Sequence, residues 1–225
     1  MKRLMHIGII CVALGFMFDC IKTGAIREVV QTSQFTDTSN LKPAILEVDE
    51  SQIEAAIRYR LDYHGQRLSD REIYNITKVL YVGHTQYNIN YLDTISMISL
   101  ESEWYKFAAG KNYRWKKING KKVKVLDSVD YGLTQQNSKS IKGRYSYASK
   151  ILKKMGISHD KSNKYDVGLN TMSCILFLSA IRREIGDGYS HRRMISSYNT
   201  GVVGYYKFPK KAKEYYNAFL QKKEI

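Results

Sequence analysis

Cysteine, proline and acidic side chains are all scarce in this sequence of 225 residues. Cys11 and Cys20 lie in an N-terminal leader considered below, so Cys174 has no partner for an intramolecular disulfide in the rest of the chain. The apolar neighbours of Cys174 predict a buried hydrophobic side chain rather than a nucleophile. Only two prolines occur, and 44% of the residues are hydrophobic, which excludes a disordered chain and predicts one domain with a sizeable core.

Positive charge is abundant, since 36 lysines and arginines stand against 21 acidic residues and give a net charge of +15. Such a surface attracts polyanions, of which nucleic acid, anionic lipid and acidic cell-wall polymers are the main classes. No helix-turn-helix, zinc-finger or RNA-binding signature accompanies the basic residues, so we expect no nucleic-acid partner. The five histidines are scattered without metal-ligand spacing, and we expect neither a metal ion nor another cofactor.

Residues 1–25 have the features of a secretory leader. A Met-Lys-Arg start precedes the apolar run Ile7–Phe18, which is short for an ordinary membrane span. This pattern predicts export, to the periplasm or in association with the cell envelope. Thr23–Ala25 supplies small residues for cleavage, but an uncleaved membrane anchor and a buried N-terminal helix are left open as alternatives. Residues 26–50 are polar and rich in serine and threonine, which is typical of a linker.

Residues 51–225 are predicted to form one α+β domain that is mostly α. Ser69–Glu72 is a capping box that opens a helix running to Leu80. Asn119-Gly120 stands between two β-prone runs and predicts a basic hairpin over Tyr113–Leu126. Apolar spacing predicts further helices at Ser51–Leu61, Ile95–Phe107, Tyr145–Met155, Val167–Ile185 and His191–Asn199, with a last helix starting near Pro209.

Glu101 comes directly after an apolar segment in which Asp93 is the single charge. A carboxyl at the end of a buried helix loses hydration, and this disfavours the ionised form and raises the pKa. A glutamate becomes a proton donor near neutral pH in this way. The alternative is that Glu101 merely starts the solvated end of a core helix. Glu103 is the rival acid, but it points elsewhere on a helix because it lies two residues further along.

Short motifs in this chain resemble those of the bacterial lytic transglycosylases related to goose-type lysozyme. In that family they are approximately Glu-Ser, Gly-Leu-Met-Gln and Ala-Tyr-Asn-x-Gly. Their counterparts here are Glu101-Ser102, Asp130–Gln135 (Asp-Tyr-Gly-Leu-Thr-Gln) and Ser197–Gly201 (Ser-Tyr-Asn-Thr-Gly). Asn170 with Phe177-Leu178 is similar to the family's Asn-x-x-x-Gly-x-x-Tyr-Leu helix. The Asp-Tyr-Gly-Leu form further resembles animal-type lysozyme and the specialised transglycosylases of secretion and conjugation machines.

This resemblance implies a lysozyme-like fold, a helical bundle around a central buried helix with the hairpin at the active-site cleft. It implies cleavage of the MurNAc–GlcNAc β-1,4 bond of peptidoglycan. Glu101 would protonate the leaving oxygen and then act as base on the muramyl 6-hydroxyl, which closes a 1,6-anhydro ring without water. The substrate's N-acetyl group assists in that family, so no second carboxylate is required. The residues implied to bind substrate or to support the acid are Ser102, Asp130, Gly132, Leu133, Gln135, Tyr198 and Asn199, with Tyr198 placed to orient Glu101.

Three departures from the family pattern bear on substrate fit. Thr134 replaces the usual Met, Cys174 replaces the usual Gly, and the basic hairpin lengthens the spacing between the first two motifs, where it could alter specificity or dock a partner. Asp130 occupies the place of the second carboxylate of animal-type lysozymes, so a hydrolase that uses Glu101 and Asp130 is an alternative to the transglycosylase. The alternative for Asp130 is a non-catalytic role, in which it forms the turn or supports the acid.

A third hypothesis is a non-catalytic basic module that binds the cell wall. All three hypotheses make the glycan strands of peptidoglycan the expected partner. A secretion or conjugation apparatus is a further candidate partner, and so is a membrane reached by the N-terminal segment.

Overall fold

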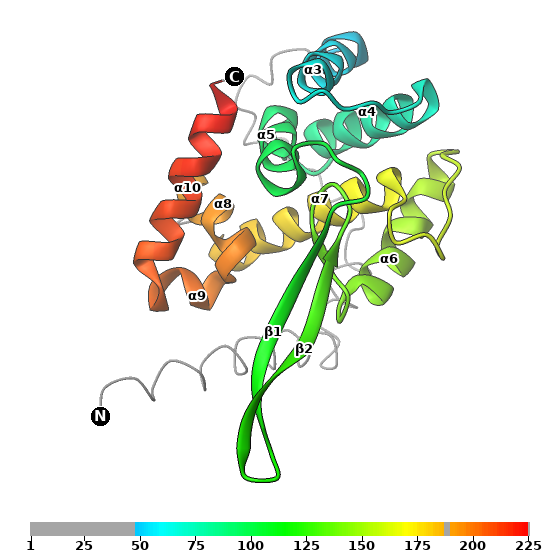
Figure 1. Ribbon diagram of the computed structural model, residues 1–225. Coiled ribbons are helices and arrows are strands. Elements are labelled where there is room, and N and C mark those ends of the chain that lie inside the picture. Colours follow the sequence, from blue (N-terminus) through cyan, green and yellow to red (C-terminus); the bar gives the residue numbers. More distant parts are fainter. Residues whose placement is uncertain (1–47, 187–189, 225) are drawn as a thin grey trace.

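The computed structural model describes residues 48–186 and 190–224, and these form a mostly helical domain with a small antiparallel sheet (Figure 1). The predicted class, α+β and mostly α, is therefore confirmed. The expected leader at 1–25 and most of the expected linker lie outside the described residues. Within the described part of the chain, no helix is both long and apolar enough to cross a membrane.

The first two described helices, α3 (Glu50–Tyr63) and α4 (Asp70–Thr85), both begin with a capping box. The Ser69 hydroxyl accepts a hydrogen bond from the Glu72 backbone N–H while the Glu72 carboxylate accepts one from the backbone N–H of Ser69, as predicted. Asp49 caps α3 in the same manner, although the prediction had placed it in the linker. These caps satisfy backbone donors that the helix itself leaves unpaired.

Helix α7 (Val167–Ile185) runs through the middle of the domain (Figure 1). It packs against α4 on one side and against α6 (Ile141–Lys154) and α8 (His191–Thr200) on others. Most of its residues are buried, which agrees with the continuous apolar pattern predicted there. Helix α6 begins four residues before the predicted start at Tyr145, because Ser140 and Gly143 interrupt the apolar pattern without stopping the backbone hydrogen bonds.

Helix α5 (Tyr91–Ser102) ends five residues before the predicted boundary at Phe107. Glu103 and Trp104 both have positive φ, at 50° and 65°, and a right-handed helix cannot continue through such residues. Trp104 then turns into the core, where its indole N–H donates to Ser99 Oγ at 2.9 Å. All residues from Asp93 to Ser99 are buried, as the sequence predicted.

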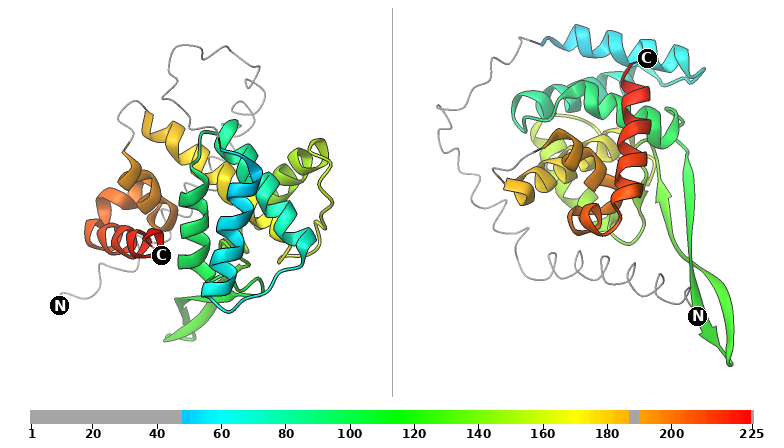
Figure 2. Two further views of the ribbon diagram at one scale, coloured as in Figure 1. Left: turned by 90° about the horizontal axis from the view of Figure 1, so that it is seen from above. Right: turned by 90° about the vertical axis from the view of Figure 1, so that its left-hand side faces the viewer.

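The sheet has the order β1-β2-β3, formed by β1 (Ala109–Ile118), β2 (Lys121–Tyr131) and the two-residue β3 (Gln136–Asn137). The predicted hairpin is confirmed, since Asn119 and Gly120 have φ of 48° and 78°, the signs that a type I′ turn requires. The strands are longer than predicted and include Asp130. Two views show the hairpin extending well beyond the helices (Figures 1 and 2).

The chain closes with α9 (Val202–Lys207), which the sequence did not predict, and α10 (Pro209–Lys223), which it did. Helix α10 packs against α5 and α8. The buried Asp93 on α5 accepts hydrogen bonds from Lys223 Nζ at 2.7 Å and from His191 Nε2 at 2.8 Å. Burial opposes ionisation of Asp93, but these two bonds outweigh it and hold its pKa below the ordinary value. This ionic cluster ties together the three helices that surround the candidate site.

Candidate active site

Glu101 lies in the last turn of α5, where the fully buried part of the helix ends and the chain turns toward the hairpin. Its carboxylate oxygen Oε1 accepts a hydrogen bond from the hydroxyl of Tyr215 on α10 at 2.5 Å. The residue as a whole is partly buried. The packing of α10 against α5 therefore places Tyr215 next to the carboxylate of the candidate acid.

The pKa of Glu101 is raised from 4.5 to about 7. Burial is the largest cause, and the negative charge of Asp130 adds to the increase, whereas the hydrogen bond from Tyr215 acts in the opposite direction. A carboxyl with this pKa is protonated in a large fraction of molecules at neutral pH. It can therefore donate a proton and afterwards accept one.

The hydroxyl and thiol groups around Glu101 keep their protons. Burial raises the pKa of Tyr198 and of Tyr215 well above the ordinary value, and raises that of Cys174 to about 12. The charge of Glu101 contributes to all three increases. Cys174 is fully buried, and a protonated buried thiol is not a nucleophile. The prediction of a small hydrophobic side chain at Cys174 is confirmed.

Asp130 lies at the base of the hairpin, near the end of β2, and both of its carboxylate oxygens are occupied. Oδ1 accepts from the Asn137 amide at 2.7 Å, and Oδ2 accepts from the Asn112 amide at 2.8 Å. The same two amides also donate to the hydroxyl of Ser128. These bonds connect all three strands. The geometry gives Asp130 a structural task as well as an electrostatic effect on Glu101.

The turn after β2 is fixed by Gly132 and Asn170. Gly132 has φ of 77°, and a Cβ atom added there would lie 2.4 Å from Asn170 Nδ2, so no other residue fits without a shift. The buried Asn170 amide donates to Tyr131 O at 2.9 Å, while its oxygen accepts the backbone N–H of Thr134 at 2.6 Å. Helix α7 thus holds the second motif in place through one side chain.

Thr134 connects the second motif to the third. Its backbone carbonyl accepts the hydroxyl of Tyr198 on α8 at 2.7 Å, and its own hydroxyl donates to Asn170. Gln136 donates to Tyr198 Oη at 3.0 Å and accepts from Arg144 on α6 at 3.0 Å. The Arg144 guanidinium lies 4.2 Å from the centre of the Phe177 ring. Thr134 is therefore part of a buried hydrogen-bond network that joins α6, α7 and α8.

Tyr198 does not orient Glu101, and this expectation is corrected. Its hydroxyl is engaged by Thr134 and Gln136, and the hydroxyl that contacts the carboxylate is that of Tyr215. The physical reason is the docking of α10 on α5, which brings a second tyrosine closer to the acid.

The other predicted site residues vary in their access to solvent. Leu133 is fully buried in the core, and the Gln135 amide folds back to donate to the carbonyl of Gly132 at 2.9 Å. Ser102 donates to the backbone carbonyl of Ile98 within α5. Asn199 is exposed on α8. Asn199 is therefore accessible to a ligand, whereas Leu133 supports the turn from beneath.

Three residues of the site were missed by sequence reasoning: Tyr215, Gln136 and Arg144. Tyr215 is one of eighteen tyrosines, and no local pattern separates it from the others. Gln136 follows directly after the recognised motif, so its position offered a signal. Arg144 is largely desolvated, and burial lowers its pKa, although basic residues in a helix ordinarily predict a solvated face.

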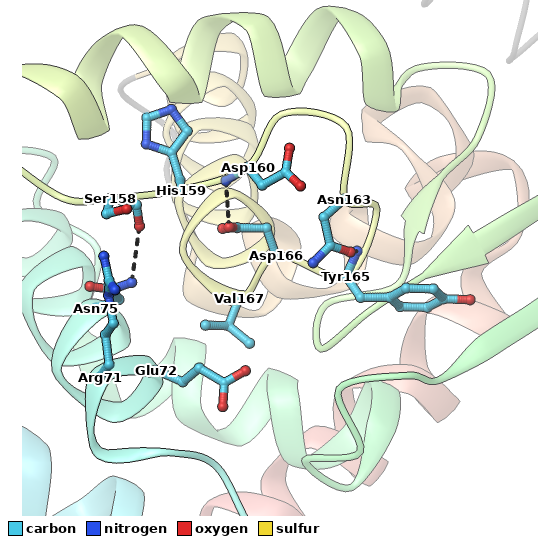
Figure 3. Close-up of a pocket in the computed structure, with 10 residues that line it drawn as sticks. All are labelled: Arg71, Glu72, Asn75, Ser158, His159, Asp160, Asn163, Tyr165, Asp166 and Val167. Carbon is cyan, nitrogen blue, oxygen red and sulfur yellow. Dashed lines mark hydrogen bonds between the residues drawn. The ribbon is translucent and has the colours of Figure 1, made fainter.

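A pocket of about 300 Å³ lies elsewhere, between the start of α4 and the loop that leads into α7 (Figure 3). Glu101 and Asp130 do not line it. Its polar groups largely bond to one another, since Asp166 accepts the backbone N–H of Asp160 and Asn75 donates to the carbonyl of Ser158. We assign it no chemistry.

Within residues 48–186 and 190–224 there is no group of three or more histidine, cysteine, aspartate or glutamate residues that could hold a metal ion. No known protein-family model matches this chain, and a comparison with curated proteins finds no match.

Proposed function

We propose that this protein is a peptidoglycan lytic transglycosylase that uses Glu101 first as an acid and then as a base. The observation that carries the proposal is the partly covered carboxyl of Glu101, whose pKa is raised to about 7. It has Tyr215 as a hydrogen-bond donor and interacts electrostatically with Asp130, which belongs to a second motif of the resemblance. A solvated helix end would not have these properties.

The chemistry requires one group to transfer a proton in both directions. Protonated Glu101 gives its proton to the glycosidic oxygen, the bond from that oxygen to C1 of the muramyl sugar breaks, and an oxocarbenium-like centre develops at C1. Ionised Glu101 then takes the proton of the 6-hydroxyl, whose oxygen bonds to C1 and closes the anhydro ring. Glu101 ends as the protonated acid with which it began. A pKa near neutrality serves both steps, because neither protonation state is strongly disfavoured.

The proposal includes a lysozyme-like fold. Its support is the mostly helical domain built on the buried helix α7, with a hairpin whose base carries Asp130. It also includes export to the periplasm or cell envelope, as the leader at 1–25 predicts, and glycan strands as the substrate. A secretion or conjugation apparatus is a candidate partner under this proposal.

A lysozyme-like hydrolase is the second candidate, and the electrostatic coupling of Asp130 to Glu101 favours it. Against it, both oxygens of Asp130 are held by asparagine amides. A carboxylate fixed in this way is suited to stabilising positive charge and to holding the strands together. The transglycosylase therefore remains the better-supported reaction.

Digestion of purified peptidoglycan tests the proposal. Wild-type protein should release fragments with 1,6-anhydro-muramyl ends, detected by mass spectrometry, whereas a hydrolase would release reducing ends. Glu101→Gln should lower the rate by roughly 10²–10⁴-fold or more because the general acid is removed. Glu103→Gln is the matched control, since Glu103 is exposed and forms an ion pair with Lys222 at 3.5 Å. Wild-type binding to peptidoglycan without any release would refute catalysis and favour the wall-binding module.

A further inference from the structure

The outer part of the hairpin, residues 111–124, combines a high positive charge with exposed apolar side chains. It carries seven lysines and arginines and no acidic residue. Arg114 pairs with Asp127 at 3.0 Å, and Lys124 lies 4.7 Å from the centre of the Tyr113 ring. Among the described residues, no ion pair joins the other cationic side chains of this segment to an acid. The members without such a pair are Lys111, Lys116, Lys117, Lys121, Lys122 and Lys124.

Apolar side chains occur on both faces of the hairpin. Residues directly opposite each other in the ladder share a face, so the pair Tyr113–Leu126 and the side chain of Trp115 lie together. On the other face, Val123 lies opposite Lys116 and Ile118 opposite Lys121. All five large apolar side chains are exposed, and Trp115 has 53% of its surface in solvent. The members are Tyr113, Trp115, Ile118, Val123 and Leu126.

The cationic and the apolar side chains of the hairpin lie away from the domain core. The hairpin leaves the helices at Ala109 and Tyr131 and extends beyond them in two perpendicular views (Figures 1 and 2). Its outer part therefore cannot bury its apolar side chains against the helices. At about 3.3 Å per residue, the ten residues of β1 reach about 30 Å.

We propose that this hairpin binds the surface of an anionic lipid bilayer and inserts its apolar side chains among the headgroups. Lysines attract anionic headgroups, and tryptophan and tyrosine prefer the interface between water and hydrocarbon. A soluble polyanion would engage the lysines but would leave Trp115, Ile118 and Val123 in water. The bilayer is the partner that satisfies both sets of side chains. Since Asp130 lies at the hairpin base, the binding also fixes the candidate active site at a set height above the membrane.

The intrinsic fluorescence of Trp115 tests this directly. The chain has two tryptophans, and Trp104 is fully buried, so a change of emission on binding comes from the hairpin even when another segment also binds lipid. The full-length protein is titrated with vesicles of phosphatidylcholine alone and with vesicles that also contain phosphatidylglycerol. We expect a blue shift with the phosphatidylglycerol vesicles only, and none in Trp115→Phe.

Lysine substitutions test whether the hairpin is the surface that binds lipid. The hairpin variant Lys116→Gln, Lys117→Gln, Lys121→Gln, Lys122→Gln should lower the lipid affinity reported by Trp115 at least a hundredfold, given about fivefold per cation near the membrane. The matched control changes four exposed lysines of α6 and should keep the affinity within a few-fold. The control substitutions are Lys142→Gln, Lys150→Gln, Lys153→Gln and Lys154→Gln.

Two outcomes would overturn the proposal. One is the absence of a blue shift with phosphatidylglycerol vesicles while polyphosphate binds to the same lysines, which would identify a general polyanion surface. The other is an equal loss of lipid affinity in the two lysine variants, which would indicate that net charge rather than the hairpin is responsible. Both measurements are independent of glycan cleavage, so they remain informative whichever reaction Glu101 performs.

Discussion

Replacing Glu101 by glutamine should make the folded protein more stable above neutral pH while abolishing its proposed activity. In the native protein this carboxyl has a pKa of about 7, against an ordinary value of 4.5. The folded state therefore binds more protons than the unfolded state between these two values, and the stability of the wild-type protein falls as pH rises through this window. Glutamine does not titrate, and its oxygen can still accept the hydroxyl of Tyr215.

The size of the effect follows from the pKa. Each pKa unit corresponds to about 1.4 kcal/mol, so the full shift corresponds to about 3 kcal/mol above pH 7. For a domain of this size, a change of that magnitude raises the melting temperature by about 6–12 °C. Below pH 4.5 the advantage of Glu101→Gln should vanish, because the native and unfolded glutamates are both protonated.

Urea denaturation of the wild type and Glu101→Gln at pH 4.5 and pH 8 measures this difference. Glu103→Gln is the control, and its stability should change by less than about 1 kcal/mol, since an exposed ion pair contributes little. Equal stability of Glu101→Gln and wild type at pH 8 would refute the burial argument. So would a gain of the same size at both pH values, because it could not arise from ionisation.

The remaining predictions concern the neighbours of Glu101 and the turn beside it. Cleavage of peptidoglycan should decline as pH rises through about 7, the pKa of Glu101. Tyr215→Phe should move this decline to higher pH, because the hydrogen bond from Tyr215 lowers the pKa of Glu101. A pH–rate profile measures both effects. Asp130→Asn should move the decline of the cleavage rate to lower pH, because the negative charge of Asp130 raises the pKa of Glu101. The product should still carry anhydro ends, and a switch in the product of wild type and variant would favour the hydrolase. Gly132→Ala should cost more than about 1 kcal/mol in denaturant unfolding, because of its positive φ and the contact with Asn170. Asn170→Ala should cost about 2–4 kcal/mol in the same assay, because it leaves buried backbone groups unpaired.

Local signals in the sequence were sufficient for most of the elements. Asn119-Gly120 and the Ser69–Glu72 capping box each determine a turn or a helix start through contacts within a few residues, and both predictions are confirmed. The end of α5 was predicted too late, since the positive φ of Glu103 is not typical of glutamate. Helix α9 was missed because its six residues carry no apolar period.

The candidate site could be predicted only where its residues are adjacent in sequence. Glu101 was selected from the apolar run before it together with the motif resemblance, and the Asp130–Gln135 run from that resemblance. Tyr215 could not be found, because its contact with Glu101 depends on how α10 packs against α5. The same applies to Arg144, whose burial against Phe177 arises from the packing of α6 on α7. Long-range packing, rather than residue type, selects these two partners.

The bond between Tyr215 and Glu101 also has a consequence for the newly made chain. The two residues are 114 positions apart, and Asp93 is likewise bonded to Lys223 near the end of α10. Synthesis therefore completes α5 well before the helix that covers its acid. Until α10 docks, Glu101 lacks the cover of this helix and is more hydrated, which favours the ionised form of its carboxyl. The emerging chain thus lacks this proton donor until α10 folds.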